Sequence, residues 1–197
     1  MACSVITVSG TPGSGKTELA KNLSAWLKER EYTEYQYFSP GEFRKGLISS
    51  RGTGVRGYEE MSAEQQNRMV DEHAIYLMKT GRVVVDGIYS AVLCYLNNID
   101  AFHVYLDAPP EMRSRRISER NRRERKGKSC AVEELFDQEN VEVKVGRRMY
   151  SIDYRFPALY DAILDTGKLS SEKVLKMLLS SMRIRCGRPA RAAAEIY

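Results

Sequence analysis

Short apolar runs alternate along the chain with longer amphipathic stretches. The runs are rich in Val, Ile and aromatic residues, which predicts buried β-strands. They cover residues 5–9, 34–39, 82–87, 101–107 and 160–165. Between and after them, apolar residues recur at helical spacing, as in the stretch from about residue 171 to 182. This alternation of strand and helix predicts an α/β domain built on a parallel sheet.

Capping signals mark where several of the helices begin. Ser39 precedes Pro-Gly-Glu, which is typical of a helix start. Ser62 opens Ser-Ala-Glu-Gln, a capping box that predicts a longer helix to about residue 80, ended by Gly81. A basic helix is expected from about residue 111, a further helix over residues 130–150, and a last one capped by Ser170 or Ser171.

The length of 197 residues suits a single domain with a sizeable core, which we place at residues 1–182. Residues 51–57 hold three glycines and predict a flexible loop, and residues 183–197 predict a mobile basic tail. No segment has about 20 consecutive apolar residues, so we expect no membrane span. The N-terminus lacks a signal-peptide pattern, so we expect a cytoplasmic protein.

The cysteines are scattered, without a C-x-x-C pair. They are Cys3, Cys94, Cys130 and Cys186. Such spacing favours reduced thiols over a zinc site or a disulfide framework.

The formal net charge is +5, and the basic excess is local. One basic segment runs from Arg113 to Lys128, and a second from Arg183 to Arg191. Such segments can bind nucleic acid, clamp phosphate groups or form a solvated helix face. Glutamates interrupt the first segment, which weakens the interpretation as a nucleic-acid surface but leaves it open.

A complete phosphate-binding motif follows the first strand. Its residues are Gly10, Thr11, Pro12, Gly13, Ser14, Gly15, Lys16 and Thr17, which match G-x-x-x-x-G-K-[ST] without a gap. The glycines let backbone N–H groups approach phosphates, and the following helix presents its positive end. Lys16 can reach the β- and γ-phosphates, and the Thr17 hydroxyl can bind Mg²⁺. The motif predicts a site for ATP with Mg²⁺.

Further candidates for phosphate chemistry lie elsewhere in the chain. Asp86 ends the third strand, where an acid can hold the Mg²⁺ shell or bind the acceptor, although it can also simply cap a turn. Arg116 and Arg120 are spaced i and i+4 and so share one helix face. Arg147 and Arg148 are adjacent, so at most one can point into a given site. Positioned guanidinium groups stabilise the charge of a transferring phosphoryl group.

Together, several stretches resemble nucleoside monophosphate kinases, and most nearly the compact type of cytidylate kinase. They are residues 6–17, 38–44, 83–87, 104–110, 147–153 and 164–166. The resemblance implies a P-loop NTPase fold of three α/β/α layers. It also implies a five-stranded parallel sheet of order 2-3-1-4-5 and a helical lid at about residues 113–150.

The resemblance further implies ATP-dependent phosphoryl transfer to a small acceptor, with CMP or dCMP as the best single candidate. On the acceptor side it implies roles for Ser39, Arg44, Asp86 and Asp153. In catalysis it implies roles for Lys16, Arg116, Arg120, Arg147 and Arg148, the first pair of arginines belonging to the lid and the second bridging donor and acceptor phosphates.

The acceptor side departs from the family pattern at one position. In these kinases an arginine closely follows the Asp-Gly after the third strand, but here Asp86-Gly87 is followed by Ile88-Tyr89-Ser90. The departure leaves open a kinase for another small metabolite. A nucleotide-dependent module that binds RNA or a protein is a third interpretation, in which the basic segments form the contact surface.

Overall fold

A parallel sheet forms the centre of the protein. The computed structural model describes residues 3–29, 35–49, 58, 61–124, 127 and 129–186. The strands are β1 (Val5–Gly10), β2 (Tyr35–Phe38), β3 (Arg82–Asp86), β4 (Phe102–Asp107) and β5 (Ala162–Asp165). They pair in parallel in the order β2-β3-β1-β4-β5, which confirms the predicted strands and the implied order.

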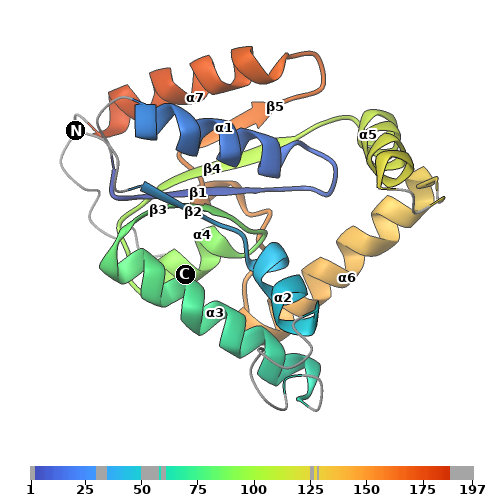
Figure 1. Ribbon diagram of the computed structural model, residues 1–197, viewed down its shortest axis with the longest axis horizontal. Coiled ribbons are helices and arrows are strands. Elements are labelled where there is room, and N and C mark those ends of the chain that lie inside the picture. The colour runs from blue at the N-terminus through green and yellow to red at the C-terminus, as the bar shows by residue number, and fades with distance from the viewer. Residues whose placement is uncertain are drawn as a thin grey trace.

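Helices cover both faces of this sheet. One face carries α1 (Lys16–Glu29) and α7 (Ser171–Cys186), and the other carries α3 (Ala63–Thr80) and α4 (Ser90–Leu96) (Figure 1). At the end of the sheet where β1 leads into the following loop lie α2 (Pro40–Ser49), α5 (Pro110–Arg123) and α6 (Val132–Tyr150) (Figure 1). A short 3₁₀ turn, Pro157–Leu159, precedes β5. The three layers agree with the expected α/β/α fold.

The core lies in two layers, one on each side of the sheet. On one side, Leu23 of α1 and Leu178 of α7 pack with Ile6 and Val104 of the central strands, all fully buried. On the other side, the apolar faces of α3 and α4 meet β3; the residues are Ala74, Met78, Leu93, Val83 and Val85. Every residue of β1 is buried, because helices cover both of its faces. The strand therefore appears in the sequence as a continuous apolar run.

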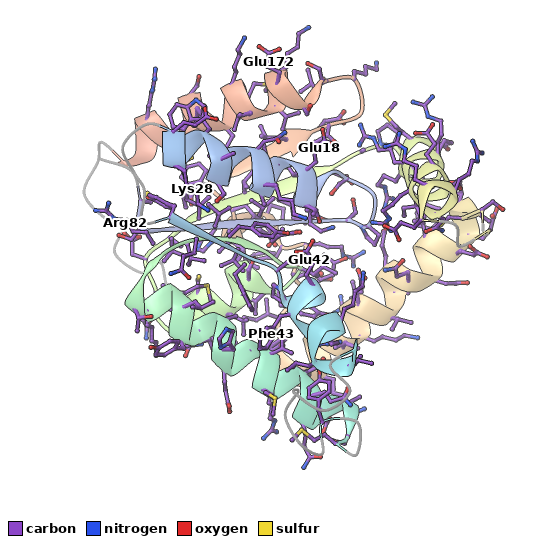
Figure 2. The ribbon with its side chains drawn as sticks, in the orientation of Figure 1. Glu18, Lys28, Glu42, Phe43, Arg82 and Glu172 are labelled. Carbon is purple, nitrogen blue, oxygen red and sulfur yellow. The ribbon has the colours of Figure 1, made fainter. Side chains whose placement is uncertain are left out.

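The polar sides of the helices face away from the core. Lys28 of α1 and Glu172 of α7 are exposed on the outer faces of these helices (Figure 2). Phe43 lies between α2 and α3 (Figure 2), where its ring stacks on His73 at a centroid distance of 4.5 Å. These contacts attach the short helix α2 to α3 beside the end of the sheet.

The predicted caps are present. Ser62 accepts a hydrogen bond from Gln65 N at 3.2 Å, and the Gln65 side chain accepts one from Ser62 N at 2.9 Å, which confirms the capping box. Ser39 caps α2 by accepting from Glu42 N at 3.3 Å. Of the two alternatives for α7, Ser170 is the cap, since its hydroxyl accepts from Lys173 N at 3.4 Å.

Helix α4 was not predicted from the sequence. Its N-cap, Tyr89, makes no side-chain capping bond, and five of its seven residues are fully or almost fully buried, so neither a start signal nor an amphipathic pattern marks it. Helix α7 continues to Cys186, so residues 183–186 belong to this helix rather than to the expected tail. The expected flexible loop at residues 51–57 and the remainder of the tail lie outside the described residues.

One cysteine corrects the expectation of reduced thiols. Cys3 is disulfide-bonded, whereas Cys94 and Cys130 are free. A disulfide joins residues that the fold brings within a few ångströms, which spacing along the chain does not reveal. Burial raises the pKa of the Cys94 thiol to about 12, so this thiol is an inert core group. Among the described helices, none is long and apolar enough to cross a membrane.

Candidate active site

The phosphate-binding loop leaves β1 in a conformation that requires glycine. Gly10 has a φ of 144°, and a Cβ atom there would lie 2.1 Å from the carbonyl oxygen of Leu106 in β4. Gly13 has a φ of 78°, and its Cβ would lie 2.8 Å from the carbonyl oxygen of Arg113 in α5. The loop therefore packs against its neighbours at distances that exclude any side chain at these positions.

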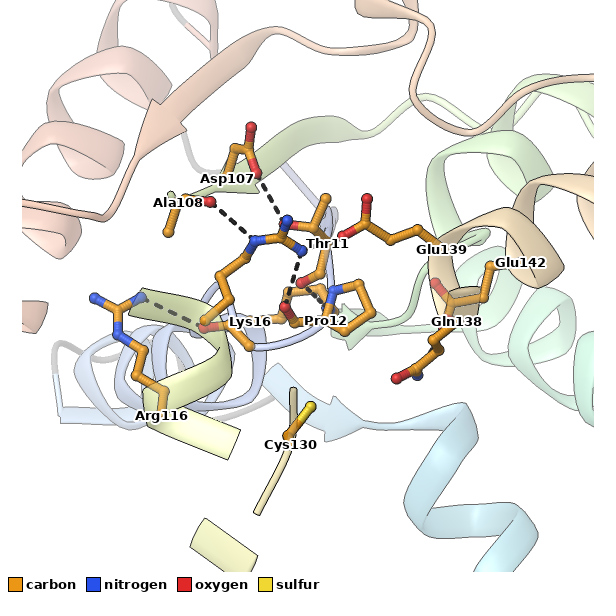
Figure 3. A network of polar contacts seen from close by, with 12 residues as sticks. Thr11, Pro12, Lys16, Asp107, Ala108, Arg116, Cys130, Gln138, Glu139 and Glu142 are labelled. Atoms are coloured by element: carbon orange, nitrogen blue, oxygen red, sulfur yellow. Dashed lines mark hydrogen bonds and ion pairs between the residues drawn. The ribbon is translucent and has the colours of Figure 1, made fainter. Parts of the chain in front are cut away.

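Side chains bind consecutive carbonyl oxygens of this loop. Lys16 Nζ donates to Thr11 O (2.7 Å), Arg113 Nη1 to Pro12 O (3.4 Å), Arg116 Nη1 to Gly13 O (3.4 Å) and Thr166 Oγ1 to Ser14 O (2.7 Å). Figure 3 shows Lys16 and Arg116 beside the loop, and Asp107, which accepts a hydrogen bond from Thr11 Oγ1 at 2.9 Å. The loop is thus held by side chains from α1, α5 and the segment after β5.

Lys16 is the positive charge at the centre of the site. Burial of its ammonium group lowers the pKa of Lys16, and the charges of Asp86 and Glu142 partly oppose this effect. An ammonium group that has lost part of its hydration binds an anion more strongly than one in bulk water. Lys16 is therefore suited to a phosphate group that enters the loop.

A hydrogen bond between Thr17 and Asp86 joins the start of α1 to the end of β3. Thr17 Oγ1 donates to Asp86 Oδ2 at 2.5 Å, and the Tyr37 hydroxyl lies 3.4 Å from the same oxygen. Burial raises the pKa of Asp86, while the hydrogen bond from Thr17 and the charge of Lys16 oppose the rise. A hydroxyl and a carboxylate are oxygen ligands of the kind that Mg²⁺ prefers.

The donor set fits Mg²⁺ that arrives with a nucleotide. In the part of the chain that the structure describes, no three His, Cys, Asp or Glu side chains form a metal-binding group. Mg²⁺ bound through substrate phosphates needs only one or two protein ligands and keeps several waters. The pair formed by Thr17 and Asp86 meets this requirement.

An open cavity of about 370 Å³ adjoins the loop. Its lining includes Lys16, Thr17, Arg116, Arg120 and Arg123. Arg116 and Arg120 thus face one space, which confirms that they share a helix face. A neighbouring cavity of about 100 Å³ also has Arg116 and Thr166 in its lining, together with four apolar side chains: Leu19, Leu106, Leu169 and Val174. One ligand could therefore place its polyanionic part in the larger cavity and its apolar part in the smaller one.

The structure does not bring Arg147 and Arg148 to the loop. Arg147 forms an ion pair with Asp153 at 3.2 Å, and Arg148 forms one with Glu64 of α3 at 2.5 Å. Their side chains are 65% and 74% exposed. Asp153 also pairs with Arg155 at 2.9 Å, and these contacts lower the pKa of Asp153. The two arginines point to different partners, in line with the expectation for adjacent residues.

Arg44 lies in a polar group between α2, α3 and the end of α6. Its guanidinium donates to Asn67 Oδ1, and within the described residues its buried Nε atom makes no hydrogen bond. Nearby, the Tyr150 hydroxyl donates to Asp71 at 2.5 Å. Burial raises the pKa of Asp71, and the hydrogen bond from Tyr150 and the charge of Arg44 oppose the rise.

Other residues at the site were not identified from the sequence. Arg113 is 3% exposed and forms an ion pair with Glu139 of α6, whereas the sequence identified it only as one member of a basic segment. Glu142 lies one helical turn further along α6, and burial raises the pKa of its carboxyl group. Thr166 donates to the loop from the segment after β5. Charge patterning alone does not distinguish a buried arginine from exposed ones on the same helix.

The strand–loop–helix unit, the Thr17–Asp86 pair and the arginine-lined cavity define an ATP-dependent phosphotransferase of the P-loop class. A family model described as an AAA domain matches residues 6–145. The cytidylate kinase of Staphylothermus marinus is 30% identical over 179 residues, covering 88% of this chain and 93% of that protein. The cytidylate kinase of Methanocaldococcus jannaschii is 27% identical over 182 residues, covering 90% and 97%. The chain belongs to the AAA-domain family of P-loop kinases, together with these cytidylate kinases.

A solved structure agrees with the fold. Shikimate kinase from Acinetobacter baumannii, in complex with shikimate, matches with a TM-score of 0.57 and 15% sequence identity. The match covers 94% of this chain and 95% of that one. At this identity the likeness concerns the fold alone.

Proposed function

We propose that the protein transfers the γ-phosphoryl group of ATP to a pyrimidine nucleoside monophosphate, CMP or dCMP. The observation that carries the proposal is the arginine-lined cavity at the loop, whose lining includes Lys16 and Thr17, the latter hydrogen-bonded to Asp86. The relatives named cytidylate kinase, which align over most of the chain, support the choice of acceptor. In this proposal, the loop after β1 forms the donor site, and the acceptor site begins at the end of β3.

The donor site would hold the triphosphate along the loop. Lys16 binds the β- and γ-phosphates, and the nucleotide base enters the smaller apolar cavity next to Arg116. Thr17 and Asp86 would hold Mg²⁺, which would supply positive charge against the charge that develops on the phosphate oxygens. Arg120 lines the larger cavity, beside Lys16, and can bind the transferring group.

Helices α5 and α6 would act as the lid. Arg147 and Arg148 reach the phosphates when their carboxylate partners, Asp153 and Glu64, exchange for phosphate oxygens. The arginine side chain of each pair is largely exposed, so its separation from the carboxylate costs little free energy. Closure excludes water from the γ-phosphoryl group and limits ATP hydrolysis.

The acceptor would need no separate general base, because a phosphate monoester is already an anionic nucleophile. Arg44 binds this phosphate through its fork of donors, one of which is buried and makes no hydrogen bond within the described residues. Asp86, at the end of β3, and Ser39, at the start of α2, border the acceptor. Asp153 contributes to the acceptor side indirectly: it holds Arg147 in an ion pair and releases it when a phosphate group binds.

Arg44→Ala is expected to lower kcat/KM for the acceptor by about 10- to 150-fold, because one charged hydrogen-bonding partner is lost. The KM for ATP should change much less. Steady-state kinetics with each substrate varied in turn measure both effects. The control is Lys45→Ala, which removes an exposed charge from the same helix. Equal effects of the two variants would contradict the role of Arg44.

A screen of ADP release tests the proposed acceptor. Wild-type protein with ATP and Mg²⁺ is expected to release ADP fastest when CMP or dCMP is added, compared with other nucleoside monophosphates, hydroxylated metabolites and RNA. If ADP is released only when another small metabolite is added, the protein is a kinase for that metabolite, which is the second candidate function. That candidate is favoured by Tyr89, which stands near the arginine position of the family and donates to Glu142 O at 2.6 Å.

A further inference from the structure

Arg113 is a buried cation directly behind the phosphate-binding loop. Arginine is seldom fully buried unless its charge is paired. Here Nε donates to Ala108 O at 2.9 Å, Nη1 lies 3.4 Å from Pro12 O, and the guanidinium pairs with Glu139. The planar guanidinium can serve all three partners because its donors point in fixed, different directions.

The contact with Pro12 has a consequence for the next residue. The peptide bonds of the described chain are trans, so the N–H of Gly13 points away from the Pro12 carbonyl. Because Arg113 holds the Pro12 carbonyl on its own side of the peptide, the Gly13 N–H points to the opposite side. Thr166 has the same effect on Gly15 through Ser14 O. Backbone N–H groups held in this way form the concave anion site of a phosphate-binding loop.

The backbone of Arg113 also packs against the Pro12–Gly13 unit. Gly13 approaches Arg113 so closely that a Cβ atom would lie 2.8 Å from the Arg113 carbonyl oxygen and 2.9 Å from its Cβ. Main chain and side chain of one residue therefore both contact the Pro12–Gly13 unit. The loop and the start of α5 are therefore packed directly against each other at this point.

Glu139 fixes the guanidinium from α6. Its side chain is 10% exposed, so the ion pair lies almost entirely out of water. A buried ion pair is weak evidence for stability, because well-packed apolar residues often replace one without loss. Stability alone therefore does not explain why two charges occupy this position, and a role in positioning the loop does.

We propose that Arg113 is a positioning residue, which holds the Pro12–Gly13 peptide in the orientation that binds nucleotide phosphates and is itself held by Glu139. The inference rests on the ATP-binding role of the loop. It does not depend on which acceptor the enzyme uses, so binding of ADP with Mg²⁺ is a sufficient probe.

The double variant Arg113→Met/Glu139→Leu separates positioning from stability. It removes both charges and keeps apolar volume, so its melting temperature should remain near that of the wild type. Its affinity for ADP with Mg²⁺, measured by calorimetry, should fall by about five- to tenfold, and KM for ATP should rise. Arg115→Met, which removes a 71% exposed arginine from the same helix, is the control and should bind ADP normally. A double variant with wild-type stability and wild-type ADP affinity would overturn the proposal.

Arg113→Lys decides the question if the double variant does not fold. Lysine keeps a positive charge beside Glu139 but lacks the fork that reaches Pro12 O and Ala108 O together. We expect a folded protein with weakened ADP binding and a raised KM for ATP. Unchanged ADP affinity in this variant would show that the fork does not position the loop.

Discussion

Lys16→Met is expected to lower kcat by about 100- to 1,000-fold without loss of folding. The ammonium group supplies positive charge where the phosphoryl group transfers, and removal of one such preorganised donor costs this much in other enzymes. Methionine keeps the length of the side chain and its apolar contacts. Stability should not fall, because burial already disfavours the charged form of Lys16. The measurements are steady-state turnover and thermal unfolding of the same preparation.

The pH dependence of stability provides a further check on Lys16. Its folded-state pKa lies below the ordinary 10.5, so the folded protein releases this proton more readily than the unfolded chain does. The wild type therefore gains stability as the pH rises from the lowered pKa towards 10.5, and Lys16→Met does not. Lys28→Met, at the exposed far end of α1, should retain both the activity and the pH dependence of the wild type (Figure 2). Wild-type turnover in Lys16→Met would exclude the loop as the phosphate site.

Asp86→Asn is expected to reduce turnover by about 10- to 100-fold at limiting Mg²⁺ and to raise the melting temperature at neutral pH. The loss follows because the variant lacks the carboxylate charge that, with Thr17, would hold the metal. The gain follows because burial raises the pKa of Asp86, so its ionised form costs stability in the folded protein. Asparagine keeps an oxygen that can accept the hydrogen bond from Thr17.

The sign of the pH effect distinguishes Asp86 from an ordinary ion-paired acid. Its folded-state pKa lies above the ordinary 3.8, so its unfavourable contribution shrinks as the pH falls from the raised value and is gone below 3.8. The stability advantage of Asp86→Asn should therefore shrink in acid. Asp137→Asn, on the exposed face of α6, serves as the control for a lost surface carboxylate. An Asp86→Asn variant with an unaltered Mg²⁺ requirement would contradict a metal-binding role.

The local parts of the fold follow from sequence because each is determined within a few residues. The loop at Gly10–Thr17, the capping box at Ser62 and the β-branched run of β3 all carry their own signals. Helix α4 carries none, because it is buried and lacks a side-chain cap. The sheet order came from the family resemblance, since no local pattern specifies which strands pair.

The parts of the site that depend on tertiary contacts are harder to predict from the sequence. Asp86 was found because it ends a strand, and the structure places it on Thr17. Arg113 was not found, because nothing in a run of arginines marks the one that turns inward to meet Glu139. The ion pairs of Arg147 and Arg148 likewise join residues that are separate in the chain. These features result from packing between helices rather than from a motif.

The most direct test of the account follows the phosphoryl group itself. ATP labelled at the γ-phosphate is incubated with the wild-type protein, Mg²⁺ and CMP, and the products are separated and identified by mass spectrometry. The account predicts that the label appears in CDP, in a molar amount equal to the ADP formed. Label found only in inorganic phosphate, at a rate that CMP does not change, would contradict it.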